Sequence, residues 1–311
     1  MNGSKWVCFS SKNCKIYYRT NQEKSWQIPS LSKYSVDFCF LILAHHRPNQ
    51  LNRLVRSIAS IFGEKSSFVI HVDKKSDISE FVINDTPSST RVDFLNERFE
   101  VDWGGLSIVK ATVALLNHAN NRYLFRHVIL ISGEDAVVNA DSLNSLGLDT
   151  TLMNYWILPH ASWWGGGMFR IDRPHFFDNK IRRNLNFKLH QYLGGLFHAY
   201  APQARLSSFF PDMVFYGGQQ WMALSQQAVA YLLQFVSDHP KIWDVFKYSF
   251  APDELFIQTI LCNNKSLKIV NKPTHYVRFN GFDSSPDYLT LDEIDSLRQN
   301  GDYLFARKYA G

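Results

Sequence analysis

Two adjacent carboxylates follow a proline in the segment SFAPDELFIQTIL, residues 249–261. Pro252 suits the first turn of a helix, where Asp253 and Glu254 would face the positive end of the helix dipole, so helix physics alone would select this sequence. A carboxylate next to an apolar run can also act as a general base that takes a proton from a substrate hydroxyl. The segment by itself leaves both interpretations open.

Other residues that could bind a ligand follow three apolar runs. The runs cover 37–44 (DFCFLILA), 67–73 (SFVIHVD) and 126–135 (RHVILISGED). Near their ends lie imidazoles and carboxylates: His45, His46, His71, Asp73, Glu134 and Asp135. Because nothing pairs with the two adjacent histidines at metal-ligand spacing, we interpret them as a strand-end or ligand-contact feature rather than a metal site.

A sheet is needed to bring these ends together. Continuous apolar runs of this length are typical of strands covered on both faces, and the segment 47–62 has apolar residues at helical spacing. A short strand at 91–95 and a helix at 107–119 continue the alternation. The pattern predicts an α/β fold with a doubly wound, mostly parallel sheet flanked by helices, whose ligands bind beyond the carboxyl ends of the strands.

The second half of the chain predicts further elements of the same domain. Residues 215–240 indicate a strand and then a helix capped by Ser225, and 252–262 a helix that includes the two carboxylates. The TLDE segment (290–293) has the spacing of a capping box. The aromatic and basic stretch at about 150–215 predicts a long functional loop. We expect one domain at 37–311, preceded by an N-terminal extension, 1–36, of unknown role.

Composition excludes several classes of protein. The chain has 311 residues, 45% of them hydrophobic, and a formal charge of +5. This charge is too small to indicate nucleic-acid binding, although it allows peripheral contact with acidic lipids. The four cysteines form no C-x-x-C motif, and we expect Cys39 and Cys262 to be buried thiols. No segment reaches the roughly 18 apolar residues that a membrane span needs.

Missing motifs narrow the possible chemistry. The chain has no G-x-G-x-x-G after its first strand, no P-loop and no H-E-x-x-H motif, which argues against dinucleotide oxidoreductases, P-loop enzymes and zinc proteases. It also has no D-x-D, the pair with which many sugar-nucleotide transferases hold a divalent ion on the diphosphate. An enzyme without that pair must neutralise the leaving phosphates with Lys or Arg.

Seven ordered segments, together covering the range from about 37 to 309, resemble the core-2/I-branching N-acetylglucosaminyltransferase and peptide O-xylosyltransferase family. They are LILAHHRPNQLNRLV, FVIHVDKKS, VDWGGLSIVKATVALL, HVILISGEDAVV, FYGGQQWMALSQQAVAYLL, FKYSFAPDELFIQTIL and YLFARKY. The resemblance implies a GT-A fold and inverting, metal-independent transfer of a sugar from a nucleotide donor.

The resemblance also implies roles for single residues. Glu254 matches the catalytic base, which leaves Asp253 a helix-capping or orienting role. Lys308 matches the lysine that contacts the donor diphosphate, with Arg307 beside it. A second basic ligand of the diphosphate has no secure match, and Arg278 is the nearby substitute.

In such a fold the nucleotide lies at the ends of the first two strands. The candidates for contacts to uracil and ribose are therefore Ala44, His45, Arg47 and Asp73. Asp135 matches a donor-site acid that could bind a sugar hydroxyl. Aromatic faces that could stack on an acceptor sugar are those of Trp163, Trp164 and Trp221, of which only the last matches a family motif.

The resulting expectation is a UDP-sugar transferase that needs no metal or other cofactor. Its donor is expected to carry N-acetylglucosamine, with xylose as the alternative, and its acceptor is a glycan, glycolipid or glycoprotein. Eukaryotic relatives resemble Golgi proteins with luminal disulfides, which this chain lacks, so we expect a bacterial cytoplasmic enzyme, with peripheral contact at the inner face of the membrane as a further possibility. A non-catalytic binding module on the same fold is the competing interpretation.

Overall fold

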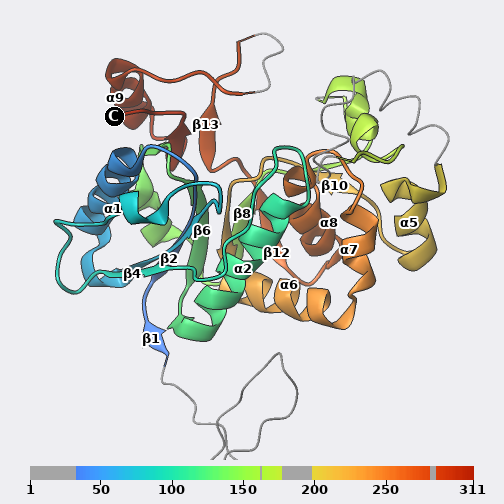
Figure 1. Ribbon diagram of the computed structural model, residues 1–311, viewed down its shortest axis with the longest axis horizontal. Coiled ribbons are helices and arrows are strands. Elements are labelled where there is room, and N and C mark those ends of the chain that lie inside the picture. The colour runs from blue at the N-terminus through green and yellow to red at the C-terminus, as the bar shows by residue number, and fades with distance from the viewer. Residues whose placement is uncertain (1–32, 162, 177–197, 281–284) are drawn as a thin grey trace, which may run out of the picture. The chain divides into compact units, whose positions relative to one another are not determined.

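The computed structural model describes residues 33–161, 163–176, 198–280 and 285–311 (Figure 1). Ser35–Gly311 forms one compact unit, and Met1–Tyr34 is a separate one. Most of the expected N-terminal extension, residues 1–32, lies outside the described residues, so its role and the exact domain boundary remain predictions.

The strands and helices follow the alternation expected from the sequence. The central strands are β2 (Phe38–Ala44), β3 (Ser66–Val72), β4 (Arg91–Phe94), β6 (His127–Ser132), β8 (Thr150–Met153), β11 (Met222–Ser225) and β12 (Lys268–Asn271). Shorter strands are β1 (Tyr34–Ser35), β5 (Tyr123–Leu124), β7 (Asp135–Val137), β9 (Trp156–Ile157), β10 (Tyr216–Gly217), β13 (His275–Val277) and β14 (Phe305–Arg307). The helices are α1 (Pro48–Phe62), α2 (Ser107–Arg122), α5 (Pro202–Phe209), α6 (Gln226–Asp238), α7 (Lys241–Phe246), α8 (Phe256–Asn263) and α9 (Leu291–Asn300).

Within the described part of the chain, the central sheet has seven strands in the order β12-β8-β11-β6-β2-β3-β4. Every neighbouring pair is parallel except the two pairs made by β11, which runs antiparallel to β6 and to β8. The register pairs Leu43 of β2 with His71 and with Ser132, so the carboxyl ends of β2, β3 and β6 lie side by side. This is the mostly parallel sheet that the sequence predicted.

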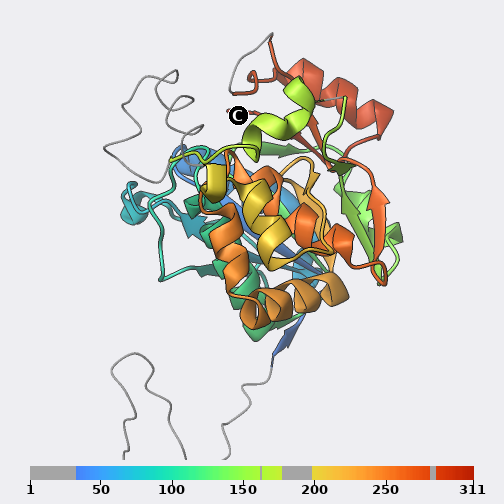
Figure 2. The same ribbon diagram turned by 90° about the vertical axis from the view of Figure 1, so that its right-hand side faces the viewer.

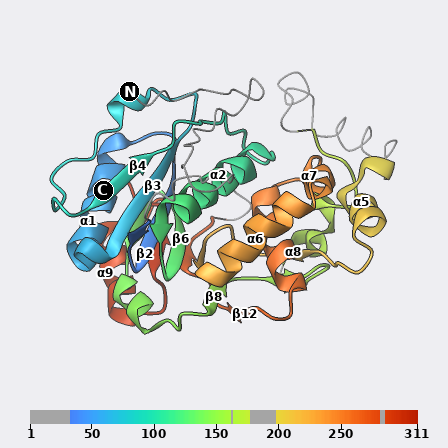
Figure 3. The same ribbon diagram turned by 90° about the horizontal axis from the view of Figure 1, so that it is seen from below.

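Helices cover both faces of the sheet. Seen from below, α2 and α6 lie side by side on one face, and α1 lies on the other (Figure 3). The core forms where β2 meets α1: Phe38, Phe40 and Ile42 are fully buried against Leu51 and other apolar residues of α1. Continuous burial of β2 explains its uninterrupted apolar run. Helices α5 to α8 gather on one side of the unit (Figure 2).

A smaller sheet crosses the carboxyl ends of the main strands. Its strand order is β13-β14-β7, with β14 parallel to β13 and antiparallel to β7. The register places Arg307 opposite Asp135. A C-terminal segment is thereby fixed next to the end of β6, although more than 160 residues separate them in sequence.

Local predictions had mixed outcomes. Ser225 accepts a hydrogen bond from the amide of Ala228 and caps α6, as predicted, and Thr290 begins α9 in a capping box. Cys39 and Cys262 are buried free thiols.

The prediction that the two carboxylates lie in the first turn of an α-helix is wrong: Pro252–Glu254 forms a separate 3-10 turn, and α8 begins only at Phe256. None of the described helices is long and apolar enough to cross a bilayer.

Candidate active site

A cavity of about 880 Å³ lies at the carboxyl ends of the parallel strands. The ends of β2, β3 and β6 contribute Ala44, His71 and Ser132 to its wall. The 3-10 turn contributes Glu254, and the C-terminal segment contributes Lys308. Five segments that are far apart in sequence thus meet at the place where a fold of this kind binds its ligands.

Glu254 lies on a tightly held turn at the cavity wall. Ala251 adopts a left-handed conformation with φ of 49°, and the carbonyl of Glu254 accepts a hydrogen bond of 2.9 Å from the amide of Gly218. Its carboxylate is half-buried and accepts a bond of 2.5 Å from Nη2 of Arg170. Burial raises the pKa of Glu254, and the charge of Arg170 opposes this rise. A carboxylate with this pKa and access to the cavity suits proton abstraction.

Asp253 also lines the cavity, next to Glu254. Burial and the neighbouring charge of Glu254 raise the pKa of Asp253 to about 7. The expected capping role is not observed, because α8 has no side-chain cap at its N-terminus. Both adjacent carboxyls thus have a raised pKa, and such a pair can divide proton-accepting and hydrogen-bonding roles between its members.

Arg307 and Lys308 both lie in the cavity wall. The guanidinium of Arg307 stacks on the ring of Trp221, 4.1 Å from its centroid, and its Nε has no hydrogen-bond partner within the described chain. Nζ of Lys308 donates to Oγ of Ser285 at 2.9 Å. Two cations with little exposed surface and unused donor capacity provide a site for an anion such as a diphosphate.

Glu134 links this basic region to the end of β2. One carboxylate oxygen, Oε1, lies 3.1 Å from Nε2 of His46 and 3.4 Å from Nε of Arg47, and it accepts a hydrogen bond from Tyr288. The other oxygen, Oε2, lies 3.7 Å from Nζ of Lys308. Sequence reasoning singled out Glu134 as a strand-end acid but assigned it no contact, because most of its partners come from distant segments.

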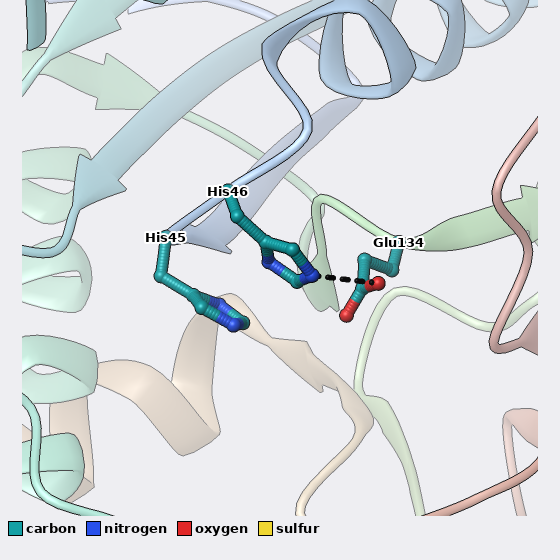
Figure 4. A group of neighbouring side chains, drawn as sticks. All are labelled: His45, His46 and Glu134. Carbon is teal, nitrogen blue, oxygen red and sulfur yellow. Dashed lines mark ion pairs between the residues drawn. The ribbon is translucent and has the colours of Figure 1, made fainter. Parts of the chain in front are cut away.

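Among the described residues, one group has the composition of a metal site: His45, His46 and Glu134, whose ligand atoms lie within 4.8 Å of one another (Figure 4). Both imidazoles come from the bend after β2 and turn toward the carboxylate. Arg47 and Lys308 contact that same carboxylate, and their positive charges oppose a bound cation. The arrangement therefore fits a metal ion poorly.

The nucleotide candidates lie in two different positions. Ala44, His45 and Asp73 line the cavity. Both carboxylate oxygens of Asp73 are used, since Oδ1 accepts from the amide of Lys75 at 2.8 Å and Oδ2 from that of Val101 at 3.3 Å. Asp73 therefore shapes the loop that follows β3 as well as facing the cavity.

Arg47 is not among the described residues that line the cavity, and its guanidinium lies over the ring of Tyr288 at 4.9 Å. Arg278 also lies outside the lining, where it pairs with Glu293 and with Asp287. Its charge is thus already balanced by two carboxylates. Of the two residues that were considered as the second diphosphate ligand, only Arg307 faces the cavity.

Asp135 is fully buried beneath the cavity wall rather than exposed in it. Its carboxylate accepts from the amide and hydroxyl of Ser132 and lies 3.0 Å from Nε2 of His275. Burial raises the pKa of Asp135, but Arg307 and His275 outweigh this and lower it below its ordinary value. This geometry leaves no oxygen for the sugar hydroxyl expected from the sequence, and the carboxylate instead anchors Arg307.

The tryptophans that were predicted to contact the acceptor also lie in different places. Trp221 is buried and lines the cavity beneath Arg307. Trp163 is not among the described lining residues, and its ring lies under the guanidinium of Arg170 at 4.5 Å. The side chain of Trp164 lies outside what the structure describes. Sequence reasoning did not select Trp103, whose side chain is 62% exposed at the cavity wall.

Comparisons with curated proteins and with solved structures gave little information. The search of curated proteins found no match. Two solved structures share low similarity: Staphylococcus aureus TarS residues 1–349 in complex with UDP-GlcNAc (12% identity, TM-score 0.37) and the bifunctional glycosyltransferase WbbM without ligand (11%, 0.40). The alignments cover 76% and 91% of this chain but only 56% and 48% of those chains. Likeness at this level adds nothing to the assignment.

The family comparison is decisive. The profile of the Core-2/I-Branching enzyme family matches residues 38–145 and 177–296, well over half of the chain. The matched ranges include the ends of β2, β3 and β6 and the 3-10 turn that carries Glu254. The chain therefore belongs to the Core-2/I-Branching enzyme family.

Proposed function

We propose that the chain transfers a sugar from a UDP-sugar to a hydroxyl of a glycan, glycolipid or glycoprotein, with inversion and without a metal ion. The observation that carries this proposal is that one cavity contains a carboxylate with a raised pKa, Glu254, together with two cations, Arg307 and Lys308. A single displacement needs one base for the attacking hydroxyl and positive charge for the leaving diphosphate.

In the proposed reaction, Glu254 takes the proton from the acceptor hydroxyl as the hydroxyl oxygen bonds to the anomeric carbon. The bond between that carbon and the diphosphate oxygen breaks on the opposite face of the sugar, which inverts the configuration. UDP leaves with its charge balanced by Lys308 and Arg307, so no acid is needed to protonate it. Uracil and ribose would lie against the ends of β2 and β3.

N-acetylglucosamine is the proposed donor sugar, and xylose is the alternative. Family membership supports the transfer of a sugar, and the donor rests on the resemblance of the motifs. Independence of metal is part of the proposal: Lys308 and Arg307 supply the positive charge, and the charges around Glu134 disfavour a cation at His45 and His46.

Calorimetric titration tests this proposal. UDP, UDP-GlcNAc, UDP-xylose and UDP-glucose are titrated into the protein in EDTA, and then with added Mn²⁺. We expect one UDP-sugar to bind with an affinity that EDTA leaves unchanged, and the same donor to support transfer to an acceptor hydroxyl. Binding only with Mn²⁺ would contradict the metal-free mechanism. Binding without transfer to any acceptor glycan tried would favour the non-catalytic binding module.

A further inference from the structure

The Glu254 carboxylate has one strong hydrogen-bond partner, Arg170, which does not belong to the described lining of the cavity. Nη2 of Arg170 contacts Oε2 of Glu254 at 2.5 Å, and within the described chain no hydrogen bond to the other oxygen, Oε1, is found. Glu254 lines the cavity, whereas Arg170 is not among the described residues that do. The contact therefore leaves Oε1 available to a substrate.

Aromatic rings hold Arg170 in place. Its guanidinium carbon lies 4.5 Å from the ring centroid of Trp163 and 5.4 Å from that of Phe250. The carbonyl of Arg170 also accepts a bond of 3.1 Å from the amide of Phe250, four residues before Glu254. An arginine stacked on aromatic rings has few alternative rotamers, so the hydrogen bond from its Nη2 restrains the carboxylate that it contacts.

Trp163 is itself fixed by close packing against two glycines. A Cβ atom at Gly167 would lie 2.4 Å from the Trp163 ring, and one at Gly217 would lie 2.5 Å from it. The next residue, Gly218, donates its amide to the carbonyl of Glu254 at 2.9 Å. The side chains of Trp163, Arg170 and Glu254 and the segment 217–218 therefore pack together around the turn.

We propose that Arg170 is the positioning residue for the base: it fixes the Glu254 carboxylate in one orientation, with Oε1 turned toward the acceptor hydroxyl. This inference rests on the proposed role of Glu254 as the base. The charge of Arg170 also favours the ionised form, and only that form accepts a proton. The two carboxyls of Asp253 and Glu254, being adjacent, need such a cation more than an isolated carboxylate does.

The test compares R170M and R170K with the wild-type protein. R170M removes the charge and the fork, and we expect kcat to fall roughly 10- to 100-fold, as misplacement of a catalytic group does, with little change in the KM of the acceptor. The pH at which kcat is lost on acidification should rise, so the defect of R170M should shrink as pH increases. R170K keeps the charge. The pH at which its kcat is lost on acidification should therefore stay near that of the wild type, although kcat itself is lower.

R205M is the matched control. Arg205 is also stacked on two rings, those of Tyr200 and Tyr248 at 5.1 and 5.6 Å, but its Nη1 donates to the carbonyl of Asp244, and neither residue is among the described ones that line the cavity. Its removal should leave kcat and the pH profile unchanged. A large rise in acceptor KM for R170M, with an unaltered pH profile, would instead make Arg170 an acceptor ligand and overturn the proposal.

A measurement without turnover separates this inference from the proposed function. Carboxyl ¹³C NMR of labelled glutamate, with E254Q used to assign the resonance, follows the ionisation of Glu254 directly. The pKa of Glu254 should be higher in R170M than in the wild type, whether or not a donor has been found. An equal pKa in both proteins would refute the role of Arg170, while a raised pKa without any transfer would refute only the proposed reaction. If R170M does not fold, as checked by circular dichroism, R170Q takes its place.

Discussion

Two carboxylates of the cavity, Glu134 and Glu254, are held in contrasting ways. Glu134 is almost fully buried and is contacted by His46, Arg47 and Lys308, as well as by Tyr288. Glu254 is half-buried, and within the described part of the chain its ion pair is with Arg170 alone. A carboxylate contacted from several sides organises its partners, whereas a carboxylate with one partner and a raised pKa, as Glu254 has, can exchange a proton.

The difference extends to the segments that carry them. Glu134 lies between β6 and β7, next to three strands whose register fixes its position. Glu254 lies on a 3-10 turn that is held by loop contacts, by a glycine amide and by stacked rings. The strand-end region is therefore suited to holding a bound nucleotide in place, and the turn to placing a reactive group against it.

The largest expected effect comes from E254Q. The amide keeps the size of the side chain but cannot take a proton, so transfer should fall about 10²- to 10⁴-fold, the usual contribution of a general base. UDP binding, measured by calorimetry, should remain nearly that of the wild type. E80Q, at an exposed position, is the control and should leave both unchanged. Transfer that survives in E254Q would show that the two carboxylates have been assigned the wrong roles.

A smaller effect is expected from K308M, on binding rather than on proton transfer. Loss of a charge-assisted hydrogen bond of about 1.5–3 kcal/mol predicts UDP affinity roughly 10- to 100-fold weaker in calorimetry. K268M is the matched control, because Lys268 is exposed and forms a salt bridge with the exposed Asp149.

The R278M variant tests, by the same measurement of UDP affinity, which basic residues contact the diphosphate. Arg278 is paired with Glu293 and Asp287 outside the cavity lining, so its loss should leave UDP binding unchanged and lower the free energy of unfolding only slightly. Weakened UDP binding in R278M, with normal binding in an R307M variant, would reverse the positions assigned to these two arginines.

Sequence patterns predicted the strand-end region better than the turn. The buried runs of β2, β3 and β6 are long and apolar, so the place where they end, and with it Asp73, could be located from hydrophobicity alone. What hydrophobicity could not resolve is which side chain of an adjacent pair faces the ligand: Glu134 lines the cavity, and Asp135 is buried beneath it. A strand places successive side chains on opposite faces, but the first residue of β7 was not evident from the sequence.

The partners of Glu254 had almost no signal in the sequence. Arg170 is 84 residues away from Glu254 and lies in an irregular segment without periodicity. The one available indication was glycine: Gly167 and Gly217 leave room for the ring of Trp163, which in turn supports Arg170. The same lack of a local pattern explains why the turn was predicted as part of a helix, since proline and two acids suit both a helix start and a 3-10 turn.

The last prediction concerns stability and tests the electrostatics of the turn directly. Burial and Glu254 raise the pKa of Asp253 from its ordinary 3.8 to about 7. Between these two values the folded protein binds a proton that the unfolded chain has lost, so Asp253 makes the free energy of unfolding fall as pH rises from about 4 to about 7. D253N removes this dependence. Its melting temperature, relative to the wild type, should therefore be higher at pH 8 than at pH 5.

D212N, at an exposed position, is the control and should show the same difference from the wild type at both pH values. If the melting temperature of D253N differs from that of the wild type by the same amount at pH 5 and at pH 8, the two carboxyls of the turn do not interact as proposed. In that case Arg170 alone would compensate both charges, and the effect of R170M on the acid limb should be larger than that of any substitution at Asp253. The stability measurement thus decides whether the charge of Glu254 and burial raise the pKa of Asp253 in the folded protein, or whether Arg170 offsets both.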